Sequence, residues 1–288
     1  MGLHIGSEGY DLGVDIWLAP ALNIHRNPLN GRNFEYYSED PLISGTMAAA
    51  AVSGCQAQGV LVTLKHLAAN NCEAHRTSSD SRMSERALRE IYLEGFRVAL
   101  KLSDAWGVMT SYNRINSIEP AESYDILTTI VRGEWGYDGL IMSDWWNDSS
   151  EVGELIAGNN LKMPEGNQGE LIAALNNGWL TRDHLKTSAK YILEAMFRVD
   201  RLKSIFDPSF KHVEATKPLR PAEEQAPAGD KNEDNQPLTP PDDSQQQPPT
   251  TDDGKKSNQG LLIGLGAAAA AIAAAAVAAV LLLKKKKK

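Results

Sequence analysis

The sequence predicts an α/β fold, a partial TIM-type (β/α) barrel, and three observations support this prediction. Short apolar runs alternate along the chain with longer segments of helical periodicity, as in repeated βα units around a parallel sheet. Polar and aromatic clusters follow the ends of these runs, where parallel barrels carry their reactive groups. No glycine-rich phosphate-binding motif follows any run, so an open doubly wound sheet is the less favoured alternative.

Each expected strand is an apolar run bounded by glycine or by polar residues. The expected strands cover 15–22, 60–64, 106–110 and 139–146, and a further short run covers 155–163. The run 139–146 is almost continuously apolar, as in a strand that is covered on both faces. It ends in one carboxylate, Asp144, followed by two indoles.

Helical segments separate these runs and begin or end at typical capping residues. The expected helices cover 41–58, 85–102, 124–135 and 183–202. Gly59 is a typical helix stop, and Ser84 and Thr181 are typical N-caps. The elements make about five βα units, whereas a complete barrel has eight. We therefore expect residues 1–207 to form a barrel domain that is incomplete at its N-terminus and, because it exposes sheet edges and core, unstable.

The composition changes after this domain. Residues 208–260 are rich in Pro, Gln and Asp and have few large apolar side chains, which predicts a disordered linker. Residues 261–283 carry no charge, and a helix of that length spans about 34 Å, enough for a hydrocarbon core of about 30 Å. They are expected to form a single transmembrane helix, with a soluble alanine-rich helix as the alternative.

The ends of the chain suggest a location for the protein. The lysines at 284–288 favour a cytoplasmic C-terminus, which would place residues 1–207 outside a cell membrane. No basic and apolar signal segment follows Met1, so the chain is expected to be the C-terminal part of a longer exported protein. The net charge of −8 includes the terminal lysines and argues against nucleic acid as a partner.

Several residues after the strands have side chains suited to chemistry, and each has a structural alternative. Asp144 is a candidate catalytic carboxylate or the N-cap of the next helix. Lys65 could form a Schiff base with His66 as a neighbouring base, or the two residues could be a hydrogen-bonded structural pair at a strand end. Arg32 either binds a ligand or forms an ion pair with Glu35.

Aromatic side chains add to this set. Trp145 and Trp146 fit a core or rim position as well as a ligand-binding surface. One carboxylate, several cations and several rings suit a carbohydrate site, because rings stack on sugar faces and cations bind hydroxyls. No spacing of His, Cys, Asp and Glu matches a metal motif, so neither a metal nor another cofactor is expected. Cys55 and Cys72 neither establish nor exclude a disulfide.

Five segments taken together resemble successive barrel motifs of glycoside hydrolase family 3, the β-glucosidase type. They are 31–41 (GRNFEYYSEDP), 65–71 (KHLAANN), 111–116 (SYNRIN), 136–146 (GYDGLIMSDWW) and 158–164 (GNNLKMP). Because the five motifs occur in the family's order, the resemblance is specific, and it covers residues 1–207.

The resemblance implies a retaining glycosidase. Asp144 matches the nucleophile that attacks the anomeric carbon and forms a glycosyl-enzyme. Two groups of residues match the sugar site: Arg32, Lys65 and His66 hold hydroxyl groups, while Tyr112 and Trp145 supply a phenol beside the nucleophile and an aromatic wall.

Departures from the family pattern limit what the resemblance implies. The first barrel strands, which carry an Asp that binds the terminal sugar, are missing. The general acid/base Glu lies on a second, α/β sandwich domain that is also missing, and we expect both parts upstream of Met1. The segment after Lys65 and His66 lacks the acid/base His of members that act on N-acetylglucosamine.

The function predicted from the sequence is therefore that of a membrane-anchored retaining β-glycosidase. Its expected substrate is a β-linked oligosaccharide or glucoside with a terminal β-D-glucosyl residue. Three alternatives stay open: an inactive or merely sugar-binding fragment, a β-xylosidase, and an aldolase-like barrel that uses Lys65 as a Schiff base.

Overall fold

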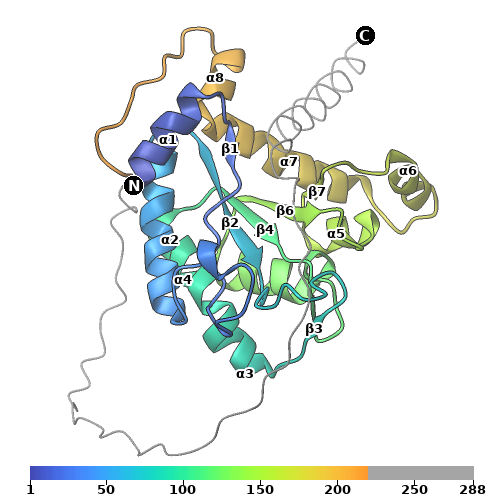
Figure 1. Ribbon diagram of the computed structural model, residues 1–288. Helices are drawn as coiled ribbons and strands as arrows, with labels where there is room; N and C mark the ends of the chain where they lie inside the picture. Colours follow the sequence, from blue (N-terminus) through green and yellow to red (C-terminus); the bar gives the residue numbers. More distant parts are fainter. Residues whose placement is uncertain (220–288) are drawn as a thin grey trace, which may run out of the picture.

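Residues 1–219 are described by the computed structural model, in which a curled parallel sheet carries helices along its outer face (Figure 1). Within these residues the sheet has the strand order β1-β2-β4-β6-β7. The strands are β1 (Ile16–Trp17), β2 (Leu61–Leu67), β4 (Gly107–Thr110), β6 (Leu140–Trp145) and β7 (Leu161–Met163). All neighbouring pairs are parallel. The result is an α/β half-barrel, consistent with the expected partial barrel.

Three of the expected strands differ in length from those observed. β2 continues through Lys65 and His66, which were expected in the loop after it. β1 is limited to two residues, although Ala21 forms an isolated parallel bridge with Lys65. The run 155–163 is mostly not a strand, because it contains the end of α5 (Glu151–Ala157) and then β7.

Two of the helical segments on the outer face have side-chain N-caps. α2 (Pro41–Gln56) follows Asp40, a cap that the sequence analysis did not single out, whose carboxylate accepts the N–H of Leu42 at 2.7 Å. The expected helix 85–102 is three segments: α3 (Glu85–Ala87), the π-helical η2 (Leu88–Tyr92) and α4 (Glu94–Ser103). Ser84 caps the first of these, as expected. The expected helix 124–135 is the π-helical η4 (Asp125–Glu134).

The two faces of the sheet belong to separate apolar clusters. The outer cluster packs side chains of β2, β4 and β6 against α2, α4 and η4, and includes Val62, Val108, Ile141, Val52, Phe96 and Leu127. The inner cluster packs strand residues Leu61, Met109, Leu140, Met142 and Met163 against Ala195 and Val199. The sheet is therefore covered by helical residues on both faces, which fits the continuous apolar runs in the sequence.

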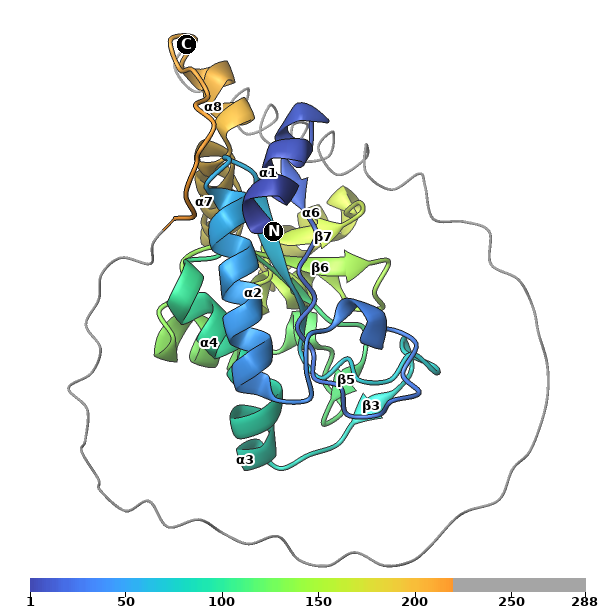
Figure 2. The ribbon, with the colours of Figure 1, turned by 60° about the vertical axis from the view of Figure 1, so that its left-hand side comes forward.

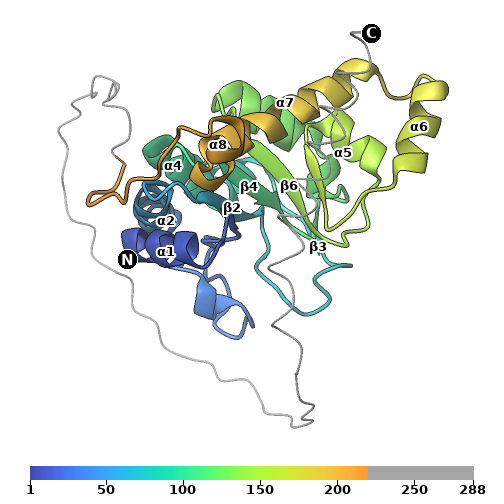
Figure 3. The same cartoon turned by 90° about the horizontal axis from the view of Figure 1, so that it is seen from above.

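The segment that covers the inner face consists of α7 (Arg182–Arg198) and α8 (Asp200–Phe206) (Figures 1 and 3). Thr181 caps α7 in a capping box with His184, whereas the expected single helix is interrupted at Val199. Arg198 lies 3.7 Å from both Asp104 and Asp138, which precede β4 and β6. The helices thus cover apolar side chains at the N-terminal end of the half-barrel. The expected instability of the incomplete barrel stays a prediction.

Some elements were not expected from the sequence: α1 (Gly2–Asp11), α5, α6 (Gln168–Asn176) and a small parallel pair of β3 (Asp80–Ser81) and β5 (Arg114–Ile115). The glycines in α1 lower its helix propensity, which is why this helix was not expected. Glycines on both helices let α1 approach α2, since a Cβ atom on Gly6 of α1 would lie 2.7 Å from the Cys55 carbonyl oxygen and one on Gly54 of α2 would lie 2.6 Å from the Leu3 nitrogen.

Residues 208–219, the first part of the expected linker, run beside α1 and α2 (Figure 2). Gln58 donates to the Ala215 carbonyl at 2.8 Å, and the Leu219 N–H donates to the Ser53 carbonyl at 3.0 Å. The rest of the linker, the transmembrane segment 261–283 and the lysines 284–288 lie outside the described residues, so those expectations stay predictions. Within residues 1–219, no helix has both the length and the apolarity needed to cross a bilayer.

Candidate active site

The carboxyl ends of β2, β4 and β6 bring together the residues that the sequence separates widely. β4 pairs with both other strands, so the three ends meet at one edge of the half-barrel. Lys65 and His66 lie near the end of β2, Tyr112 follows β4, and Asp144 lies near the end of β6. Asp144 is thus part of the strand itself, and the N-cap of α5 is Ser150, so the capping alternative for Asp144 is wrong.

Asp144 is a buried carboxylate, 7% exposed, with its two oxygens in different surroundings. Oδ1 accepts the N–H of Trp145 at 2.8 Å. Oδ2 lies 3.5 Å from Nε2 of His66 and has no hydrogen-bond donor at ordinary distance among the described residues. Burial raises the pKa of Asp144, whereas the Trp145 N–H and the charges of Lys65 and Arg32 lower it. Burial outweighs these effects, so the pKa of Asp144 is raised; the Tyr112 hydroxyl and the two cations limit the rise and so favour the ionised form that nucleophilic attack requires.

His66 is a neutral neighbour of this carboxylate. The residue is 1% exposed, and burial, together with the charges of Arg32 and Lys65, lowers its pKa well below the usual value. Its backbone is fixed by Asn23, which accepts the His66 N–H and donates to the His66 carbonyl, both at 2.9 Å. Asn23 was not singled out from the sequence, because its role depends on the pairing of two distant segments.

Lys65 and Arg32 supply positive charge. Burial lowers the pKa of Lys65, while the carboxylates of Glu35 and Asp144 raise it. Arg32 pairs with Glu35 and lies 3.8 Å from Glu73. The ion-pair interpretation of Arg32 is thus confirmed; it is compatible with sugar binding, since the Arg32 charge also acts on Asp144.

Tyr112 is held beside the nucleophile candidate by residues that the sequence analysis missed. The Arg76 guanidinium lies 4.6 Å from the centre of the Tyr112 ring, and Glu73 accepts a hydrogen bond from Arg76 at 3.1 Å. Burial and then the charge of Asp144 raise the pKa of Tyr112, which keeps its hydroxyl protonated. The charged residues Glu73 and Arg76, which follow the Lys-His pair in the same loop, were the feature of the sequence that could have indicated their role.

The two indoles after Asp144 have different positions. Trp145 is partly buried and packs against the inner apolar cluster. Trp146 is 72% exposed, with a left-handed backbone at φ +48°. Trp145 is therefore the indole that lies against the core, and Trp146 is the rim residue.

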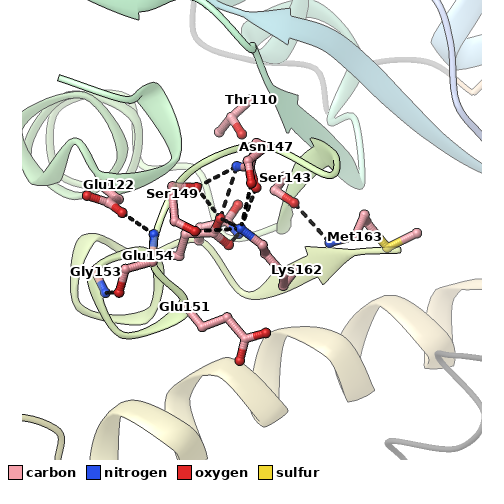
Figure 4. Close-up of polar contacts among 12 residues, drawn as sticks. Thr110, Glu122, Ser143, Asn147, Ser149, Glu151, Gly153, Glu154, Lys162 and Met163 are labelled. Atoms are coloured by element: carbon pink, nitrogen blue, oxygen red, sulfur yellow. Dashed lines mark hydrogen bonds and ion pairs between the residues drawn. The ribbon is translucent and has the colours of Figure 1, made fainter. Parts of the chain in front are cut away.

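A buried polar network, also missed from the sequence, holds the segment after β6 (Figure 4). The Lys162 ammonium group on β7 donates to Glu154 at 2.9 Å, to the Ser149 carbonyl at 2.7 Å and to the Asn147 side chain. Asn159 donates to the second oxygen of Glu154 at 2.7 Å. These contacts tie the loop that leaves the Asp144 strand to the neighbouring strand and to α5.

No group of three His, Cys, Asp or Glu side chains in residues 1–219 is arranged to hold a metal ion. Cys55 is buried and Cys72 is exposed, and both are free thiols.

The chain is similar to known glycosidases over most of the described residues. A β-glucosidase of Ruminococcus albus is 46% identical over 207 residues, which cover 67% of this chain and 22% of the relative. An exo-α-(1→6)-L-arabinopyranosidase of Bifidobacterium longum is 42% identical over 206 residues, 71% of this chain and 27% of the relative. The structure of β-glucosidase 3B from Thermotoga neapolitana in complex with glucose matches with a TM-score of 0.68 and 45% identity, covering 70% of this chain and 30% of that one.

The chain thus spans about a quarter of the length of these curated relatives. The family model described as the glycosyl hydrolase family 3 N-terminal domain matches residues 1–195, which include all of the strand-end residues above. The chain therefore belongs to glycosyl hydrolase family 3.

Proposed function

We propose that this chain supplies the nucleophile and the sugar-binding groups of a retaining β-glycosidase that acts on terminal β-D-glucosyl residues. The observation that carries the proposal is the buried Asp144 carboxylate, one oxygen of which has no hydrogen-bond partner within residues 1–219 and which lies near the positive charges of Lys65 and Arg32. The β-glucosidase relatives support the choice of glucose.

In the proposed reaction, Oδ2 of Asp144 attacks the anomeric carbon, and the glycosidic C–O bond breaks as the new ester bond forms. The leaving-group oxygen takes up a proton, and water then hydrolyses the ester to release the sugar and regenerate the carboxylate. Both steps pass through a transition state with positive charge on the sugar ring, which an ionised carboxylate stabilises.

The neighbouring residues have separate roles. Lys65, Arg32 and neutral His66 bind sugar hydroxyls, and the first two also favour the ionised form of Asp144. The protonated Tyr112 hydroxyl stands beside the carboxylate, and Trp145 forms an apolar wall. Holding these groups in fixed positions around the sugar lowers the activation free energy of the nucleophilic attack.

The test is the hydrolysis of an aryl β-D-glucoside with a good leaving group, which needs little acid assistance, by the full chain and by Asp144→Ala. We expect the variant to lose activity by a factor on the order of 10³ or more. Asp148→Ala, which removes an exposed carboxylate from the adjoining loop, is the matched control and should keep its activity.

An activated 2-fluoro glucoside should label the wild-type chain at Asp144, as located by peptide mass spectrometry. A label on another residue, or equal rates for Asp144→Ala and the wild type, would contradict the proposed nucleophile. Parallel assays with aryl β-xylosides and α-L-arabinopyranosides measure which sugar is preferred.

A further inference from the structure

Glu73 is a carboxylate near the strand ends that takes no part in the reaction proposed above. Its Oε2 atom accepts a hydrogen bond from Nη1 of Arg76 at 3.1 Å, and its Oε1 atom lies 3.8 Å from Nη1 of Arg32. The pair with Arg76 joins neighbouring residues of one loop, and such pairs contribute little to stability. The contact with Arg32 is different, because it joins two loops that leave different strands of the sheet.

The loop after β1, which carries Arg32, and the loop after β2, which carries Glu73, are packed together. The hydroxyl of the buried Tyr36 donates to the Asn70 carbonyl at 2.9 Å. A Cβ atom on Gly31 would lie 3.8 Å from Cβ and Cγ of Glu73, so the stem of this glutamate lies against the backbone that precedes Arg32. The fold therefore sets the position of the Glu73 carboxylate relative to Arg32.

The Arg32 guanidinium keeps hydrogen-bond donors available while it is paired. Its Nε atom donates to Glu35, and within residues 1–219 its two Nη groups donate to no protein acceptor. The contact with Glu73 is longer than a hydrogen bond, and Oε1 of Glu73 accepts no hydrogen bond from the described residues. The charge of Glu73 therefore attracts the end of the Arg32 side chain and leaves its Nη–H groups free to bind a ligand.

Arg76 holds the Glu73 carboxylate from the other side. Its guanidinium donates to Oε2 of Glu73 and lies 4.6 Å from the centre of the Tyr112 ring, which follows β4. A carboxylate between two guanidinium groups attracts both and offsets the repulsion between them. Glu73 is therefore the link between a cation beside Tyr112 and a cation assigned to the sugar hydroxyls.

We propose that Glu73 is a positioning residue of the glycone site, which holds the Arg32 guanidinium in its sugar-binding position before the sugar arrives. The inference rests on the proposed function, because that function assigns Arg32 to the sugar hydroxyls. Glu73 touches neither the sugar nor the scissile bond, and its negative charge acts through Arg32. Without this charge the long Arg32 side chain has more rotamers to lose on binding, and misplaced binding groups reduce the rate strongly.

The experiment measures kcat/KM of the full chain on an aryl β-D-glucoside with a good leaving group. Glu73→Gln keeps the shape of the side chain and removes its charge, and it should lower kcat/KM about 10- to 100-fold. Glu73→Asp keeps the charge on a shorter stem and should recover part of this loss.

Glu94→Gln on α4 is the matched control. Glu94 pairs with the arginine three residues later, as Glu73 does, and the two glutamate side chains are 26% and 23% exposed. Glu94→Gln should keep the kcat/KM of the wild type, and the two Gln variants should have similar melting temperatures.

A double-mutant cycle with Arg32→Gln tests whether Glu73 acts through Arg32. Residues that act through one another have non-additive effects, so Glu73→Gln should cost less than about 3-fold in the Arg32→Gln background. The same loss in both backgrounds would overturn the positioning role, because Glu73 would then act on folding or on another group. Higher activity of Glu73→Gln than of Glu73→Asp would also overturn it, because the charge would then be irrelevant.

Two further outcomes separate this inference from the proposed function. Equal kcat/KM in Glu73→Gln and the wild type, with the fluoro glucoside still attached at Asp144, would overturn the role of Glu73 and leave the nucleophile intact. A wild type that shows neither hydrolysis nor labelling would overturn the proposed function together with the inference that rests on it.

Discussion

The two ends of the half-barrel differ in how they are filled. At the N-terminal end, Leu61 and Leu140 are almost fully buried against Val199, between α7 and α8. At the C-terminal end, Oδ2 of Asp144 and Nδ1 of His66 are buried polar atoms without hydrogen-bond partners among the described residues. Such atoms also occur at the N-terminal end, but there Nη1 of Arg198 and Oδ1 of Asp15 face opposite charges, Asp104 at 3.7 Å and Arg201 at 3.4 Å. Burial of unpaired polar atoms costs free energy that apolar packing has to offset.

The two ends of the half-barrel therefore have different roles. The apolar end supplies stability, and the polar end keeps groups available for a substrate at a cost in stability. The Glu154 and Lys162 network is an exception at the polar end, since its charges are paired inside the protein. Substitutions at three positions distinguish these regions.

The largest effect is expected for Lys162→Met, which leaves the carboxylate of Glu154 buried without its cation. Removal of one partner of a buried pair costs about 3–5 kcal/mol, and urea unfolding of the full chain measures the loss. Lys190→Met is the control, because the Lys190 and Glu194 side chains are 62% and 47% exposed, and its cost should be below about 1 kcal/mol. Similar losses in both variants would mean that the network is no stronger than a surface pair.

A somewhat smaller effect is expected for Leu61→Ala at the apolar end. Truncation of a fully buried leucine removes apolar burial and leaves a cavity, which costs about 2–5 kcal/mol in the free energy of unfolding. Leu12→Ala, where the side chain is 82% exposed, should change stability by less than about 0.5 kcal/mol. Glucose affinity of the folded Leu61→Ala chain should equal that of the wild type; a large change would contradict the separation of the two ends.

The smallest effect on stability is expected for Asp144→Asn, which should stabilise the folded chain at neutral pH, whereas the two substitutions above destabilise it. Because burial raises the pKa of Asp144 in the folded chain, the unfolded chain ionises first as the pH rises above 3.8. The stability that the protonated carboxyl contributes is therefore present at low pH and is lost as the pH rises through the folded-state pKa.

Thermal unfolding at several pH values checks this prediction. The Asn variant should melt above the wild type at neutral pH, and the difference should shrink as the pH falls from the folded-state pKa of Asp144 towards 3.8 and then stay constant. Asp148→Asn provides the comparison with an exposed carboxylate. A wild type that gains stability relative to Asp144→Asn as the pH rises would contradict the assigned direction of the pKa shift.

Much of the fold and part of the site were predictable from the sequence. Local patterns located the Asp144 strand and the caps at Ser84 and Thr181, because hydrophobic periodicity and capping depend on neighbouring residues. They also located the polar residues near the ends of three strands, although Lys65, His66 and Asp144 lie within their strands and not after them. The family motifs selected Arg32, Lys65, His66, Tyr112, Trp145 and Asp144, and the structure places these residues around the strand ends. Their individual roles in sugar binding stay predictions.

The sequence by itself determined the alternation of strands and helices, and with it the edge of the sheet where the polar residues gather. Only the tertiary structure decided that Asn23 fixes His66, that Lys162 is paired inside the protein, and that Trp145 and Trp146 have different exposures. It likewise decided that α7 and α8 cover the inner face. The physical reason is that periodicity and capping act within a few residues, whereas these contacts join segments far apart in the chain and depend on how the sheet curls.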